Sequence, residues 1–174
     1  MRSNKTHKLA IASVMAALCV VFLFLGSVIT VLDLSFAAMS SIVIVLAVIE
    51  LGGSYPWLIW AVVSILSLLL LPDKFGAVTF LVFAGYYPII KKHIEGLHSL
   101  VIQWILKLIV FNAAITLIIA VSVFILKLPT DEIGFGIIVY GLCNITFIIF
   151  DIALTKLIAL YLFRFRNKFK FFKK

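Results

Sequence analysis

Long apolar stretches, separated by short polar breaks, run along the whole chain. The breaks fall at Asp33, at residues 52–56, at residues 72–74, at residues 91–96 and around Pro129. Within the stretches apolar residues are continuous, not alternating, which favours helices over the strands of a membrane barrel. The pattern predicts six helices, at residues 9–32, 34–51, 55–71, 75–90, 100–126 and 133–163, and a basic tail at 164–174.

The composition changes the solvent in which these helices are expected to fold. Hydrophobic residues make up 65% of the 174 residues and charged residues 13%. A soluble domain is about half apolar and about a quarter charged, and a chain this short cannot hide so much apolar surface from water. We therefore expect an all-α membrane protein, with a single transmembrane domain spanning residues 1–174.

Two of the predicted helices are short for crossing a membrane. A hydrocarbon core of ~30 Å takes about 20 residues, more than residues 55–71 or 75–90 provide. The second and third helices could also fuse into one broken hairpin, which would leave five spans. We favour six.

The position of the charges predicts the orientation. The net charge is +8, and with both ends in the cytoplasm eleven Lys and Arg residues fall on the inner side and two on the outer side. This asymmetry predicts a multi-pass protein of the cell membrane with cytoplasmic N- and C-termini. The basic residues lie beside apolar helices, so nucleic acid is not an expected partner. A cleaved signal peptide is the alternative for the first helix, but its apolar stretch is too long.

Small residues form a patch near the cytoplasmic end of the first helix. Ala12 and Ala16 are four residues apart, as are Ser13 and Ala17. Small residues at this spacing let another helix approach closely. The patch could therefore receive a separate membrane subunit, or it could pack within this chain.

Polar residues share a face of the sixth helix, and a second set lies on the fifth. Tyr140, Asn144 and Asp151 are spaced so that they fall on one face. Asn112 and Thr116 share a face of the fifth helix. Polar groups inside a membrane face the protein interior or a cavity. Asn112 and Thr116 could line one ligand cavity together with Asn144 of the sixth helix. Alternatively, these polar residues could form a structural hydrogen-bonded seam.

One ion pair is expected within the spans. Lys107 and Asp151 lie at comparable depth in the fifth and sixth helices. Pairing would neutralise both charges. Removing either residue would leave the charge of the other without a partner, so we interpret the pair as structural.

Motifs that carry catalysis do not occur in the sequence. It contains no P-loop, HExxH or GxSxG motif and no Cys/His spacing typical of a metal site. We therefore expect no catalytic residues, no metal and no cofactor, and we expect that the protein is not an enzyme.

The chain resembles the S components of energy-coupling factor (ECF) transporters, the substrate-binding subunits of bacterial vitamin importers. The resemblance is carried by the basic N-terminus followed by KLAIASVMAALCVVFLFLGS with its Ala12/Ala16 patch. It is also carried by the chain length, the six predicted spans with inside ends, and Asn144 and Asp151 in the last helix. It covers nearly the whole chain as architecture.

The resemblance implies a function and partners. An S component binds a vitamin or similar micronutrient near the outer face and works with a membrane-embedded coupling subunit and two cytoplasmic ATPases. Ala12 and Ala16, with Ser13 and Ala17 beside them, would contact the coupling subunit. The ligand candidates would be Asn112, Thr116, Tyr140, Asn144, Phe80 and Phe83. The predicted outer loops are shorter than in members whose first loop forms a lid.

The alternative function is structural. A small membrane subunit of the rod-shape and cell-wall scaffold type would have similar size and span count. It would use its small-residue faces to hold partners and would need no ligand cavity.

Overall fold

A computed structural model describes residues 2–124 and 137–165 of the chain, and no strand occurs among them. The predicted helix ends at 126 and 133 and most of the basic tail, residues 166–174, lie outside these ranges. The chain divides into two compact units, Met1–Ile133 and Gly134–Lys174, each described by itself. The all-α fold class expected from the sequence is confirmed for the described residues.

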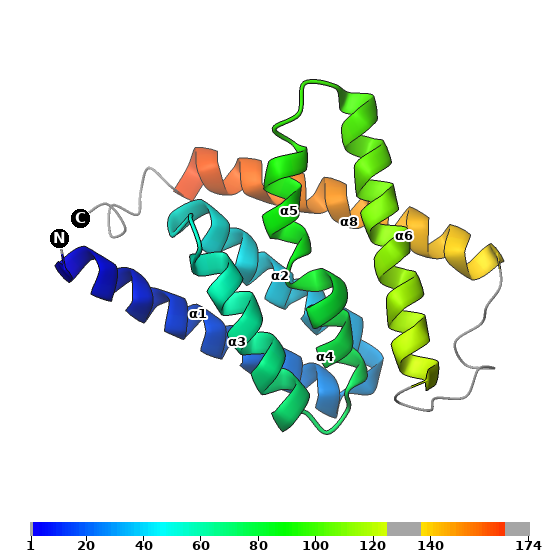
Figure 1. Cartoon of the computed structure of the whole chain (residues 1–174), viewed down its shortest axis with the longest axis horizontal. Coiled ribbons are helices and arrows are strands. Elements are labelled where there is room, and N and C mark those ends of the chain that lie inside the picture. The colour runs from blue at the N-terminus through cyan, green and yellow to red at the C-terminus, as the bar shows by residue number, and fades with distance from the viewer. Residues whose placement is uncertain (1, 125–136, 166–174) are drawn as a thin grey trace. The chain divides into compact units, whose positions relative to one another are not determined.

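The first unit holds most of the helices (Figure 1). Their order is α1 (Arg2–Val28), a short 3-10 turn η1 (Thr30–Leu32), α2 (Asp33–Glu50), α3 (Tyr55–Leu70), α4 (Phe75–Thr79), η2 (Phe80–Ala84), α5 (Tyr87–Ile94) and α6 (Leu100–Phe124). The second unit contains α8 (Ile137–Leu160) and the π-helical turn η3 (Tyr161–Phe165).

Four of the described helices are long and apolar enough to cross a membrane. They are Lys5–Val28, Asp33–Glu50, Leu100–Val121 and Tyr140–Arg164. Large apolar side chains stand exposed along them, among them Val14, Val21, Val101 and Ile109. Such a surface is unfavourable in water and is typical of lipid contact. Helix α3 has 16 residues and is about 24 Å long, which is short for crossing a hydrocarbon core of ~30 Å.

The fourth predicted helix is interrupted. Over residues 75–94 the chain forms α4, then the π-helical turn η2, then α5. The amide of Gly85 donates to the carbonyl of Phe80 at 2.8 Å, a bond across five residues that marks the wider turn. Pro88 lies in the first turn of α5, where its missing N–H costs no helical bond. The prediction of one continuous helix at 75–90 is therefore wrong.

The polar loop predicted at residues 91–96 is also shorter than expected. Helix α5 continues to Ile94, so Lys91, Lys92 and His93 form its last turn. Basic side chains at a helix C-terminus interact favourably with the helix dipole, and this interaction favours the extension of α5 through these charged residues.

Helices α2 and α3 are two separate helices. The turn between them contains Gly52 and Gly53 at φ of 61° and 56°. This left-handed backbone conformation is readily adopted only by glycine, so the Gly-Gly pair ends α2 and reverses the chain.

The core of the first unit lies where α1, α2 and α3 meet α4, η2 and α5. Small side chains bring α1 and α2 together: Ala12, Ala16 and Cys19 of α1 are buried in the same cluster as Ala37 and Ala47 of α2. The close approach lets the hydroxyl of Ser40 donate to the carbonyl of Cys19 at 3.3 Å. Small residues act here as a packing surface within the chain.

Candidate functional site

The polar candidates on α6 are bonded within their own helix. The Asn112 amide nitrogen donates to the carbonyl of Leu108 at 2.8 Å, and the Thr116 hydroxyl donates to the carbonyl of Asn112 at 2.9 Å. In α8 the Asn144 amide nitrogen makes the same kind of bond, at 2.8 Å, to the carbonyl of Tyr140. Such backward bonds satisfy a donor that lies in an apolar helix.

The ligand candidates are divided between the two units. Phe80, Phe83, Asn112 and Thr116 belong to Met1–Ile133, whereas Tyr140 and Asn144 belong to Gly134–Lys174. Their convergence on one ligand stays a prediction of the sequence.

The two phenylalanines occupy different environments. Phe80 is 0% exposed and belongs to the core between α1, α2 and α3. Phe83 stacks on Tyr87, with ring centroids 4.9 Å apart, and meets the edge of Phe111 of α6 at 5.2 Å. Phe83 thus ties α5 and α6 to η2, and Phe80 is a packing residue.

The small-residue patch on α1 is divided between two faces. Ala12 and Ala16 are buried in the core, so they pack within the chain, which is the second of the two interpretations of their spacing. Ser13 and Ala17 are exposed, and the Ser13 hydroxyl donates to the carbonyl of Leu9 at 3.0 Å. In this structure Ser13 and Ala17 are the part of the patch that another helix can reach.

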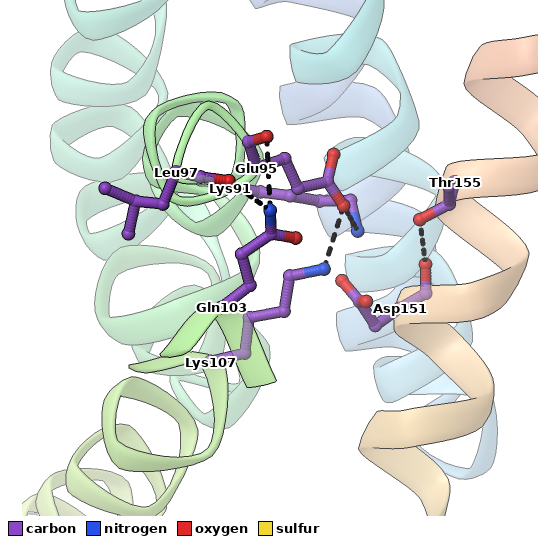
Figure 2. A network of polar contacts seen from close by, with 7 residues as sticks. All are labelled: Lys91, Glu95, Leu97, Gln103, Lys107, Asp151 and Thr155. Carbon is purple, nitrogen blue, oxygen red and sulfur yellow. Dashed lines mark hydrogen bonds and ion pairs between the residues drawn. The ribbon is translucent and has the colours of Figure 1, made fainter. Parts of the chain in front are cut away.

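A charged cluster joins the ends of α5 and α6 (Figure 2). The ammonium groups of Lys91 and Lys107 each lie 2.8 Å from the same oxygen, Oε1 of Glu95. The side chain of Lys91 is 1% exposed and that of Lys107 5%, while Glu95 is 31% exposed. The carboxylate therefore neutralises charge at the edge of an apolar interior.

Gln103 fixes the turn beside this cluster. Its amide nitrogen donates to the carbonyls of Leu97 at 2.7 Å and Glu95 at 3.4 Å (Figure 2). The loop between α5 and α6 is held in place as a result. Sequence reasoning placed Lys91 in a loop and overlooked Glu95, although their spacing of four residues is that of a helical ion pair.

The predicted partner of Lys107, Asp151, lies in α8. There the Thr155 hydroxyl donates to the Asp151 carbonyl at 2.9 Å. Because Lys107 and Asp151 belong to different units, their ion pair stays a prediction, alongside the Glu95 contact that Lys107 makes within its own unit.

Asp33 is buried, although in the sequence it marks a polar break between two apolar stretches. It is the first residue of α2 and is 4% exposed. Two glycines make room for its carboxyl group. A Cβ atom on Gly76 of α4 would lie 2.4 Å from Oδ1 of Asp33, and one on Gly26 of α1 would lie 3.0 Å away. Asp33 thus packs where the ends of three helices meet, and a carboxylate in the first turn of α2 suits the helix dipole.

An apolar groove of about 450 Å³ lies between α3 and α6. Its lining includes Trp57 and Trp60 of α3, Leu81 of η2, Tyr86, and Ala113 and Leu117 of α6. The sequence analysis predicted no groove at these residues. The groove depends on the π-helical turn and on the neighbouring helices, which local sequence does not specify.

Across residues 2–124 and 137–165, no three His, Cys, Asp or Glu side chains gather closely enough to hold an ion.

Comparison of the chain with protein families, curated proteins and solved structures found no match.

Proposed function

We propose that the chain is the substrate-binding membrane subunit of an ECF-type importer. It would capture a vitamin or similar micronutrient outside the cell and deliver it with a coupling subunit and two ATPases. The observation that carries the proposal is the exposed small-residue pair Ser13 and Ala17 on α1. Around it α1 exposes large side chains such as Leu9, Val14 and Leu18, so the pair is where a partner helix can approach the backbone.

The proposed setting is the bacterial plasma membrane. Six spans would cross it with both chain ends in the cytoplasm, the two shorter ones being α3 and the interrupted segment 75–94. The basic residues near the N-terminus and in α5 would then lie on the inner side, and the excess of Lys and Arg in these segments supports this orientation.

The proposed ligand contacts are Asn112, Thr116, Tyr140, Asn144 and Phe83. Amides and aromatic rings suit a planar heterocycle with hydrogen-bonding edges. Phe80 is the weakest of the candidates, because its side chain is enclosed in the core.

Ligand binding is tested by thermal unfolding in detergent against a panel of vitamins and nucleobases. A compound that binds only the folded protein stabilises it by about 2.7 kcal/mol at a hundredfold excess over its dissociation constant. We expect one compound to raise the melting temperature and Asn144→Ala to abolish the shift. The control is Thr146→Ala, an exposed α8 residue with the same kind of backbone bond. If no compound shifts the melting temperature and cell-wall synthesis proteins co-purify in place of ATPases, the scaffold function replaces this one.

Partner docking is tested separately on α1. Ser13→Leu and Ala17→Leu add bulk to the exposed pair, so we expect loss of the co-purifying coupling subunit and ATPases. Ligand-induced stabilisation should persist, because neither residue is a ligand candidate. Val14→Leu changes a neighbouring exposed position and should retain the partners. Retention of partners by both leucine variants at 13 and 17 would place the docking surface elsewhere.

A further inference from the structure

The apolar groove between α3 and α6 has a fixed shape. The Trp60 indole nitrogen donates to the carbonyl of Leu81 at 3.2 Å, which locks the ring against the π-helical turn. Trp57 meets Trp60 edge to face, with ring centroids 5.7 Å apart. Gly85 is required at the back of the ring, because a Cβ atom there would lie 2.5 Å from Cδ1 of Trp60. The groove is therefore a preformed feature of the first unit.

Small residues open the groove on the α6 side. Ala113 and Ala114 line it opposite the tryptophans. A larger side chain at Ala113, which is exposed, would project into the same space. The volume of about 450 Å³ falls within the range of about 300–1,000 Å³ typical of sites for small molecules.

The chemistry of the lining selects an apolar occupant. Among the lining residues, Trp57, Trp60 and Tyr86 carry a side-chain polar atom, and that of Trp60 is bonded to Leu81. Apolar cavities stay dry, since water there would lose its hydrogen bonds. A polar heterocycle requires convergent donors and acceptors, so hydrocarbon fits this groove better.

The surroundings indicate where that hydrocarbon comes from. The α6 wall belongs to the apolar segment Leu100–Val121, which is long enough to cross a membrane. On the two helices that flank the groove, Leu58 and Val62 of α3 and Ile109 of α6 are exposed apolar side chains. The groove thus opens onto a surface suited to lipid. We propose that it binds an acyl chain of a membrane phospholipid.

The test uses tryptophan fluorescence and lipids with bromine atoms in the acyl chain, which quench a nearby indole. The three tryptophans are Trp57, Trp60 and Trp104. One variant keeps only Trp60 (Trp57→Phe, Trp104→Phe), and another keeps only Trp104 (Trp57→Phe, Trp60→Phe). Both are reconstituted in vesicles of phosphatidylcholine with plain or brominated chains. Trp104 is 36% exposed and Trp60 is less so, yet we expect Trp60 to be quenched at least as strongly.

Filling the groove provides the decisive comparison. Ala113→Phe in the Trp60-only protein should remove most of the quenching, whereas Ile109→Phe, on α6 outside the groove, should not. Leu117→Phe serves the same purpose if Ala113→Phe does not fold. Neither groove variant should change the quenching of Trp104 in the other protein.

Two results would overturn the proposal. One is a Trp60 that brominated chains do not quench, which would mean that a partner helix or other side chains fill the groove. The other is equal quenching of Trp60 in the Ala113→Phe, Leu117→Phe and Ile109→Phe proteins, since the acyl chain would then lie outside the groove.

Discussion

Gly76→Ala is expected to destabilise the protein by about 2 kcal/mol, the usual cost of forcing extra volume into a packed interior. The added methyl carbon would lie 2.4 Å from Oδ1 and 3.0 Å from Cγ of Asp33. Asp33 has a short side chain and is 4% exposed, so it cannot move aside without disturbing α2. The free energy of unfolding in mixed detergent micelles measures the effect.

Two comparisons make this prediction specific. In an Asp33→Ala background the clash is absent, so Gly76→Ala should cost much less, and the double-mutant cycle should show strong coupling. Gly26→Ala, whose methyl would lie 3.0 Å from the same oxygen, should show a smaller effect of the same kind. Additive costs of Asp33→Ala and Gly76→Ala would show that the carboxyl group is not held against Gly76.

Glu95→Gln is expected to destabilise the protein by about 3 kcal/mol, near the lower end of what the loss of one member of a buried ion pair costs. It removes the carboxylate that lies 2.8 Å from the ammonium groups of both Lys91 and Lys107. The two lysines are almost fully buried, so solvent does little to screen their repulsion. The partial exposure of Glu95 is the reason for choosing the lower end.

The control and the rescue lie within the same helix. Lys92→Gln changes the charge next to Lys91 at an exposed position and should alter the unfolding free energy by less than about 0.5 kcal/mol. Lys91→Met combined with Glu95→Gln removes one of the two repelling charges and should recover part of the loss. An effect of Glu95→Gln no larger than that of Lys92→Gln would show that the cluster adds little to stability.

The apolar groove and the polar ligand candidates of the first unit differ in chemistry. The groove beside Trp60 is apolar, whereas the ligand candidates Asn112 and Thr116 carry amide and hydroxyl groups. A lipid chain in the groove and a vitamin at the polar candidates are therefore separate proposals, each with its own experiment. A negative quenching test would leave the proposed transport function untouched. A negative screen of vitamins and nucleobases would likewise leave the acyl-chain proposal untouched.

Several features followed from the sequence because they depend on local composition. Continuous apolar stretches predicted an all-helical chain, and the bounds of α2, α3 and α6 lie within a residue or two of those expected where the structure describes them. The Gly52-Gly53 turn could be predicted because glycine is the residue that adopts its backbone conformation readily. The break within residues 75–94 was missed, since a π-helical turn leaves no distinct apolar period.

Sequence spacing also showed which residues share a helix face, but not which neighbour that face meets. It grouped Ala12 with Ala16 and Ser13 with Ala17, and only tertiary packing buried the first pair and left the second exposed. Packing likewise enclosed Asp33 between glycines of α1 and α4, and brought Lys107 of α6 to the Lys91–Glu95 pair of α5. Helical periodicity is a property of one segment, whereas burial and ion pairing depend on contacts between residues far apart in the chain. The sequence therefore determined an apolar, helical protein, and the tertiary structure decided which small, charged and aromatic residues are available to a partner or a ligand.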